Sequence, residues 1–238
     1  MLFSLRNTPQ IRAQRELLER PDVLWYNAVC APIFAAENKD WKIFGGYWAG
    51  KKERIQADYQ LLQTEYSAVN SGELLDKLHE IVQTGERFHY NHLMNEYRNR
   101  GFFDLSREQI CMDAAFPHLS LYQRRWLYDM IAGYKTYEEK ALLGYDISRA
   151  IYGAQLGFIA GHLETKEALE LCKEFAKTLQ AAFSNWEDFT NSYLLGYEYH
   201  TQQDKQDLSS GLAQRIYLIE QLHKEKGPFD LDWNIALE

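Results

Sequence analysis

The sequence predicts an all-α fold: a single compact domain of about nine to eleven helices, with one aromatic and glycine-containing loop and an extended C-terminal tail. Apolar residues recur at intervals of three and four, as in Leu212, Ile216 and Ile219, which is the spacing of one helix face. Strand-like alternation of apolar and polar residues is scarce. Helix starts are legible as well, because Ser or Thr is repeatedly followed three residues later by Glu or Gln.

Capping residues and prolines set the expected helix starts. Pro9, which follows Thr8, and Pro21 suit a first helical turn, because a backbone N–H at that position makes no hydrogen bond within the helix and proline lacks that N–H. Four capping boxes predict further starts: Ser106 with Gln109, Ser120 with Gln123, Thr136 with Glu139, and Ser184 with Glu187. Together with the apolar periodicity, these signals predict helices over residues 9–20, 22–36, 52–67, 72–85, 88–99, 107–115, 121–133, 137–160 (broken near Gly144), 166–182, 185–200 and 209–225.

Two stretches leave the helical pattern. Residues 38–51 contain Gly45 and Gly46 among aromatic side chains, which predicts an ordered loop or a short hairpin. Residues 226–238 form an acidic and aromatic tail, which either packs back on the body or docks into something else. Since the chain has no linker-like stretch and no internal repeat, residues 1–238 are expected to form one domain.

Composition narrows the classes of function. The apolar fraction of 46% and the charged fraction of 25% are those of globular proteins. A net charge of −8 disfavours nucleic-acid binding, which needs clustered Lys and Arg, and it favours a basic partner. No run of eighteen apolar residues predicts a membrane span. The 16 Tyr, 12 Phe and 6 Trp are the unusual feature, and such rings suit both helix packing and protein interfaces.

The three cysteines indicate a reducing compartment. Cys30, Cys111 and Cys172 are far apart, form no C-x-x-C pair and cannot all pair within the chain. Each lies in a helical apolar pattern, so we expect small buried hydrophobic side chains rather than nucleophiles. The N-terminal residues contain no apolar run typical of a signal peptide, and a cytoplasmic location is therefore expected.

The sequence predicts no metal and no cofactor. His89, His92 and Glu96 share one helix face, but neither H-E-x-x-H nor a repeated Glu-x-x-His pattern accompanies them. A polar helix face is therefore the favoured interpretation. Phosphate-binding glycine loops and the G-x-S-x-G motif of serine hydrolases are also absent from the sequence.

One polar pair lies in an otherwise apolar segment. Asp146 and Arg149 are one helical turn apart and are predicted to form a buried ion pair that fixes helix register. The alternative is a pocket in which they act on a ligand beside the ring-bearing stripe of Trp186 and Tyr193, with His162 or His200 nearby.

Several segments resemble a known family. They are Gly144-Tyr145-Asp146-Ile147-Ser148-Arg149-Ala150, then Gly157, Gly161 and Thr165 to Ala168, then Ser184 to Phe189 and Tyr193-Leu194-Leu195-Gly196, preceded by Trp25, Gly45-Gly46-Tyr47 and Thr84-Gly85. This pattern resembles the bacterial domain of unknown function 1266 family, the YbeU/YbeR-like proteins, over most of residues 22–200. Tyr145 departs from it, since the family pattern has Trp there. The resemblance implies a helical bacterial cytosolic protein and brings no catalytic residue with it.

These observations favour a non-enzymatic protein-binding protein, most concretely an immunity-type protein that masks a basic bacterial toxin or effector. An acidic surface would steer the encounter, and buried rings would anchor the complex. The candidate contacts are Trp41, Tyr47, Trp48, Asp230, Asp232 and Trp233. Two alternatives stay open: an enzyme or small-ligand binder with the pocket around Asp146, Arg149 and Trp186, and a scaffold or regulatory subunit without a toxin.

Overall fold

Helices form all the extended regular structure of the described chain, which confirms the predicted all-α class. The computed structural model describes residues 8–50, 52–111, 116–224 and 226–237, and within them it contains eleven α-helices and no strand. The helices are α1 (Pro9–Leu17), α2 (Pro21–Ala36), α3 (Lys52–Glu65), α4 (Ser71–Gln83), α5 (Gly85–Asn99), α6 (Arg107–Cys111), α7 (Leu121–Tyr137), α8 (Leu143–Ala160), α9 (Thr165–Ala182), α10 (Trp186–Thr201) and α11 (Gly211–Leu222). Three single 3₁₀ turns are η1 (Phe102–Asp104), η2 (Glu138–Lys140) and η3 (Pro228–Asp230).

Several helices begin where their capping residues predict. The Thr8 hydroxyl accepts a hydrogen bond from the Ile11 backbone N–H at 3.2 Å, and Pro9 follows it at the first helical position. Ser120 and Gln123 form a complete capping box, with side chain to backbone distances of 3.2 and 2.9 Å. These bonds satisfy N–H groups that would otherwise have no partner in the first turn.

Two of the four predicted capping boxes are wrong. Thr136 lies inside α7, where its hydroxyl donates to the carbonyl four residues earlier. The chain leaves the helix only at Glu138, whose φ is +52°, so the break expected near Gly144 lies just before α8. Ser184 does not cap α10, because the neighbouring Asn185 accepts the hydrogen bond from the N-terminal turn at 2.8 Å.

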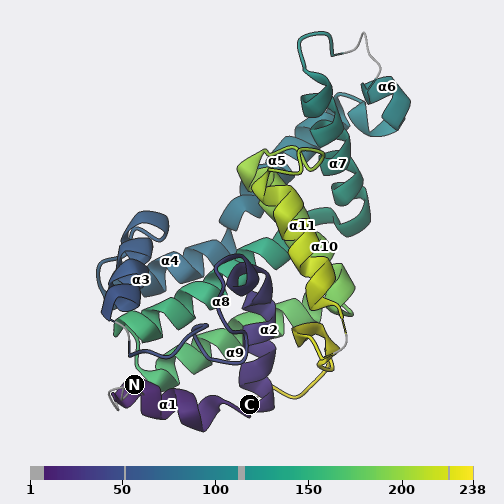
Figure 1. Ribbon diagram of the computed structural model, residues 1–238. Coiled ribbons are helices and arrows are strands. Elements are labelled where there is room, and N and C mark those ends of the chain that lie inside the picture. The colour runs from purple at the N-terminus through teal and green to yellow at the C-terminus, as the bar shows by residue number, and fades with distance from the viewer. Residues whose placement is uncertain (1–7, 51, 112–115, 225, 238) are drawn as a thin grey trace.

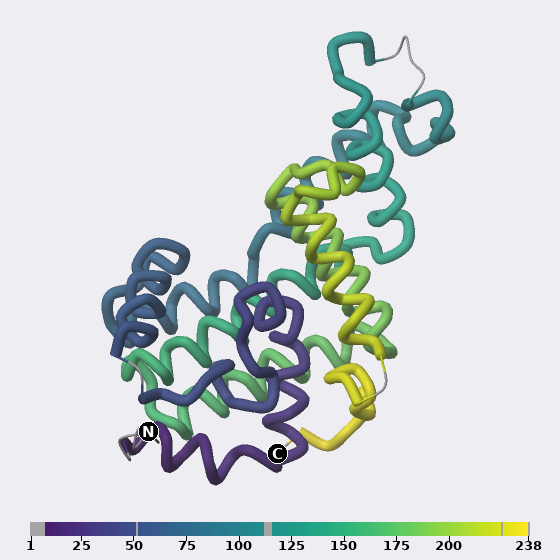
Figure 2. Tube along the Cα trace, viewed as in Figure 1, coloured from purple at the N-terminus to yellow at the C-terminus, as the bar shows by residue number. Residues whose placement is uncertain are grey.

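Helix α8 lies at the centre of the body, in contact with α2, α3, α4, α5, α9 and α10 (Figures 1 and 2). It can be surrounded because nearly all of its side chains are apolar or small. The crossing with α10 is especially close. A Cβ at Gly144 would lie 2.7 Å from the Phe189 carbonyl oxygen, and one at Gly196 would lie 2.3 Å from the Tyr145 Cβ. Both positions therefore require glycine to let the helices approach.

A separate lobe projects from the body (Figure 1). It consists of the distal part of α5, η1, α6 and α7, and it has its own hydrophobic cluster around Tyr90, Met94 and Met130. The Tyr90 hydroxyl donates to the Met130 carbonyl at 2.7 Å, which joins α5 to α7 inside that cluster. Because α5 begins at α8 and ends in the lobe, it links the two hydrophobic clusters.

The stretch between α2 and α3 is a loop, and its described residues contain no hairpin. Two buried glutamines hold its backbone. Gln14 donates to the carbonyls of Phe44 and Tyr47 at 2.7 and 2.8 Å, and Gln155 accepts from the Gly45 N–H at 2.7 Å. The polar backbone of the loop is thus satisfied although much of it is buried.

The C-terminal tail packs back on the body through a cluster of three indoles. The rings of Trp25, Trp186 and Trp233 lie with centroids 4.8 to 5.1 Å apart. Their N–H groups donate to backbone carbonyls, among them Trp25 to the Trp233 carbonyl at 3.1 Å and Trp233 to the Phe183 carbonyl at 3.0 Å. The described part of the tail is therefore a structural element of the body.

Candidate functional site

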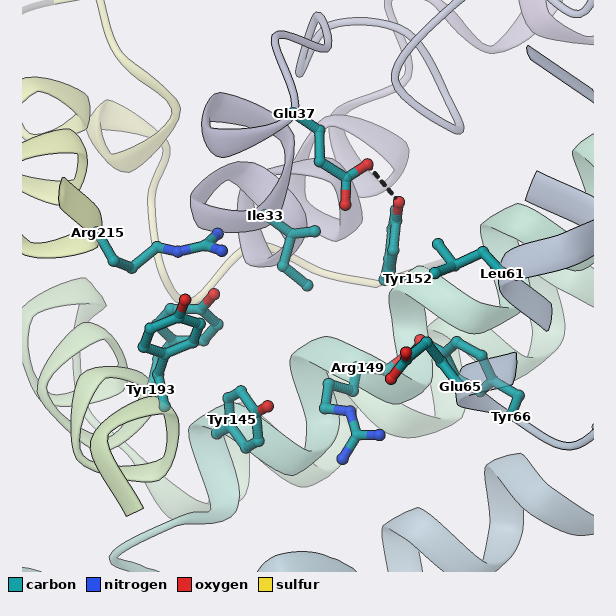
Figure 3. A pocket seen from close by; sticks show the side chains of 11 residues that line it. Ile33, Glu37, Leu61, Glu65, Tyr66, Tyr145, Arg149, Tyr152, Tyr193 and Arg215 are labelled. Carbon is teal, nitrogen blue, oxygen red and sulfur yellow. Dashed lines mark hydrogen bonds between the residues drawn. The ribbon is translucent and has the colours of Figure 1, made fainter. Parts of the chain in front are cut away.

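Two adjoining hollows open on the body where α2, α3, α8, α10 and α11 meet. The first, the tyrosine–arginine hollow, has a volume of about 220 Å³ and is lined by Ile33, Glu37, Leu61, Glu65, Tyr66, Tyr145, Arg149, Tyr152, Tyr193, Tyr197 and Arg215 (Figure 3). The second, the Lys39 hollow, has a volume of about 370 Å³ and is lined by Glu37, Lys39, Tyr47, Arg54, Ala57, Asp58 and Leu61. Since Glu37 and Leu61 line both, the two hollows form one continuous surface.

Two arginines from different helices enter the tyrosine–arginine hollow. Arg215 of α11 lies with its guanidinium 4.8 Å from the Tyr197 ring centroid and donates to the Pro32 carbonyl. Arg149 of α8 lies 5.5 Å from the Tyr145 ring centroid. Stacking against rings holds both guanidinium groups in place while leaving N–H edges available for other contacts.

Buried tyrosines make the wall between the arginines. Burial raises the pKa of Tyr145 and Tyr193 well above the usual range, so both hydroxyls stay protonated at physiological pH. The Tyr66 hydroxyl is engaged, since it donates to the Arg149 carbonyl at 2.8 Å. Within the described residues, the hydroxyls of Tyr145 and Tyr193 have no hydrogen-bond partner, which leaves them available to a ligand.

The Lys39 hollow is built on a polar network. The Lys39 ammonium lies 2.8 Å from Glu37, 3.6 Å from Asp58 and 2.7 Å from the Tyr152 hydroxyl, which itself donates to Glu37 at 2.6 Å. The Tyr47 hydroxyl donates to Asp58 at 2.5 Å. Burial raises the pKa of Asp58, and the Lys39 charge opposes that rise. The charges of Glu37, Lys39 and Asp58 are thus engaged with one another inside this network.

Asp146 does not pair with Arg149, so that prediction is wrong. Its carboxylate is fully buried, accepts from the backbone N–H of Glu86 at 2.9 Å and of Arg87 at 3.3 Å, and lies 3.0 Å from the Arg87 guanidinium. It therefore caps α5 from the side. Gly85 makes this possible, because its φ is +54° and a Cβ there would lie 2.3 Å from the Asp146 carboxylate.

The predicted pocket of four residues is divided in the structure. Arg149 and Tyr193 line the tyrosine–arginine hollow, whereas Asp146 of α8 does not and instead contacts the first turn of α5. Trp186 belongs to the indole cluster instead, and its N–H donates to the Leu231 carbonyl at 2.7 Å. On α10, Trp186 in the first turn therefore packs in the core, whereas Tyr193 further along the helix lines the hollow.

Neither of the two histidines expected near the pocket lines it, but His200 lies against Tyr145 of its wall, with ring centroids 5.7 Å apart. His200 pairs with Glu86 at 2.9 Å, and the hydrogen bond from His200 lowers the pKa of that carboxyl. His162 lies against the Tyr59 ring, with centroids 5.1 Å apart.

The candidate partner contacts differ in exposure. Trp233 is buried in the indole cluster and cannot meet a partner without a rearrangement, whereas Tyr47, although only 5% exposed, lines the Lys39 hollow. Trp41 and Trp48 are half-buried against the core, whereas Asp230 and Asp232 are exposed.

Sequence reasoning missed Arg215, Tyr152 and Lys39, which the fold brings to the two hollows. Arg215 follows the ordinary charged spacing of α11, and Lys39 lies in a loop next to Asn38, whose φ is +53°. No local pattern marks these side chains, because their partners come from other helices.

The remaining metal and thiol candidates give no site. His89, His92 and Glu96 lie on α5, with His92 3.5 Å from Glu96, and no group of three or more potential ligands in the described residues could hold a metal ion. Cys30 and Cys172 are buried, and burial raises the pKa of both thiols, which disfavours the reactive thiolate.

Comparison with known proteins gives one result. The sequence profile of the family described as "Protein of unknown function (DUF1266)" matches residues 47–233, which include both hollows except for the part contributed by α2 and the start of the following loop. No curated protein and no solved structure matches the chain. Among the described residues, no helix has the length and apolar character that crossing a membrane requires.

Proposed function

The chain belongs to the DUF1266 family, and within it we propose a non-enzymatic protein-binding protein that receives an extended segment of its partner in the two adjoining hollows. The most concrete form of this proposal is an immunity-type protein that masks a toxin or effector in the bacterial cytosol. The observation that carries it is the continuity of the two hollows through Glu37 and Leu61.

The open shape of the hollows supports a partner segment over an enclosed metabolite. Both hollows, of about 220 and 370 Å³, are open to solvent, whereas small-molecule sites bury most of their ligand. Two neighbouring shallow hollows suit two side chains of one extended chain. Their lining is rich in Tyr and Arg, the residue types that most often anchor protein interfaces.

The chemistry of the lining also favours binding over catalysis. Asp146, the acid expected in a pocket, is committed to capping α5. The Lys39 ammonium lies between Glu37 and Asp58 and donates to the Tyr152 hydroxyl, so it is already engaged within the chain.

Charge supports a masking role. The net charge of −8 would attract a basic toxin or effector over long range, and rim charges act mainly on the rate of encounter. The exposed Asp230 and Asp232 lie on the tail, where they add to that acidic surface.

The test is capture of the partner from the native host with a tagged chain, followed by mass spectrometry. Leu61→Glu places a charge on the wall that both hollows share, and Val69→Glu is the matched control, since Val69 is 47% exposed and lines neither hollow. We expect a stoichiometric partner with the wild type and with Val69→Glu, and its loss with Leu61→Glu. Equal capture by both variants, or no partner at all, contradicts the proposal.

A second candidate function has a specific observation in its favour. Two arginines and the tyrosines Tyr145 and Tyr193, whose hydroxyls have no partner within the described residues, line the tyrosine–arginine hollow, and such donors also suit a small anionic ligand. A lone chain from the host that retains a small molecule of this kind would favour it over the partner segment.

A further inference from the structure

The tyrosine–arginine hollow contains a positive charge that no carboxylate of the described residues pairs with. The Arg215 guanidinium donates to the neutral Pro32 carbonyl and stacks on Tyr197, and no carboxylate of the described residues lies within salt-bridge distance of it. A half-buried cation without an anion is costly, because the surrounding protein solvates it less well than water does. Such a group is suited to receive an anion from a ligand.

Hydroxyl donors face the same space. Tyr193 is 1% exposed, and Figure 3 shows its hydroxyl directed toward the Arg215 guanidinium. Tyr145 is 6% exposed, and its hydroxyl points into the hollow on the side of Arg149. Both hydroxyls lack a partner within the described residues, so an oxyanion beside Arg215 would gain a hydrogen bond from Tyr193.

Arg149 is only loosely neutralised. Its guanidinium lies 3.8 Å from Glu86, and the same carboxylate oxygen lies 2.9 Å from His200. Arg149 therefore leaves part of its positive charge on the wall of the hollow, where it adds to the attraction of an anion.

The two glutamates on the rim do not cancel this field. Glu37 is engaged by Lys39 at 2.8 Å and by the Tyr152 hydroxyl at 2.6 Å. Glu65 is exposed to solvent, where its charge is screened. The apolar side chains of Ile33 and Leu61 complete the wall and can contact an aliphatic stem.

We infer that the tyrosine–arginine hollow binds the carboxylate of an acidic side chain on the partner segment, through the Arg215 guanidinium and the Tyr193 hydroxyl. This inference rests on the proposed function for the source of the carboxylate. The inference predicts that the partner segment contains an acidic residue, even if the rest of the partner's surface is basic.

The experiment compares two short capped peptides, alanyl-glutamyl-alanine and alanyl-glutaminyl-alanine, by nuclear magnetic resonance titration, with inorganic phosphate as a third probe. We expect the glutamyl peptide to bind at millimolar concentration and the glutaminyl peptide to bind far more weakly. Tyr193→Phe removes one hydrogen bond to a charged group and should weaken binding roughly 10- to 100-fold. Arg215→Met should weaken it at least as much, whereas Arg12→Met, an exposed change on α1, should have no effect.

Several results overturn the inference. These are equal binding of the two peptides, no binding of either, unchanged binding by Tyr193→Phe and Arg215→Met, and binding of phosphate without the glutamyl peptide. Thermal unfolding of each variant establishes that it is folded, and Tyr193→Phe preserves the ring in case Arg215→Met is unstable.

The same variants separate this inference from the proposed function. Capture of the host partner by Arg215→Met as well as by the wild type would overturn the acidic anchor and leave the partner-binding function intact. Binding of the glutamyl peptide by a chain that captures no partner would leave the carboxylate site and overturn the function.

Discussion

Replacing Asp146 with Ala should destabilise the protein by removing the cap of α5 and the ion partner of Arg87. The carboxylate is fully buried, and it holds the first turn of α5 through two backbone N–H groups at 2.9 and 3.3 Å and the Arg87 guanidinium at 3.0 Å. Because α5 leads into the lobe, the loss affects the junction between the two hydrophobic clusters.

The magnitude follows from these contacts. Breaking a buried ion pair by removing one partner costs about 3–5 kcal/mol, and losing a helix cap costs about 1 kcal/mol. Two features reduce the first contribution: Arg87 is 15% exposed, and it also donates to the carbonyls of Ile81 and Val82. We therefore expect Asp146→Ala to lower the free energy of unfolding by about 3–4 kcal/mol.

The assay is urea unfolding followed by circular dichroism, arranged as two double-mutant cycles. The cycle of Asp146→Ala with Arg87→Met should give a coupling energy of about 1–3 kcal/mol. The matched cycle with Arg149→Met should give a value near zero, because Arg149 pairs with Glu86 instead.

The opposite ranking would refute the reasoning. A large coupling with Arg149 and none with Arg87 would restore the register pair that the sequence suggests. An unchanged free energy of unfolding for Asp146→Ala would show that neither the cap nor the ion pair stabilises the fold.

Three further changes test the remaining structural arguments. Gly85→Ala should cost at least about 1–2 kcal/mol in urea unfolding, because φ is +54° there and the new Cβ would meet the Asp146 carboxylate; a neutral effect would contradict the close approach. Trp233→Ala should cost about 3–5 kcal/mol, since its ring completes the indole cluster, and an unaffected melting temperature would mean that the tail is not part of the core. Burial raises the pKa of Glu198 from 4.5 to about 7, so the folded chain retains a proton that the unfolded chain releases between these values. Stability from this group therefore falls as pH rises from 4.5 to 7, by up to about 3 kcal/mol, and Glu198→Gln should flatten that part of the stability profile, whereas an unchanged slope would refute the assignment.

Local signals in the sequence were sufficient for the class of fold and for many helix starts. Thr8 and Ser120 cap as predicted because each bond joins a side chain to a backbone group only three residues away. Where a competing cap was adjacent, as with Asn185 next to Ser184, the same rule placed the start one residue too early.

Rules about near neighbours in the chain could not predict the tyrosine–arginine hollow. Arg149 and Asp146 are one turn apart, yet packing gives them different partners: Asp146 turns to Arg87, and Arg149 to the hollow. Tyr193 was singled out for its ring stripe, but its position beside Arg215 depends on how α10 and α11 pack together.

The sequence by itself determined that this chain folds as helices, where most of them begin, and that its family resemblance carries no catalytic motif. Those properties depend on periodicity and on contacts between near neighbours in the chain. Only the tertiary structure decided which charges are neutralised, because the partner of a buried charge comes from a distant helix. That is why Arg215, whose pattern is that of an ordinary surface arginine, lies in the tyrosine–arginine hollow with no carboxylate of the described residues paired to it.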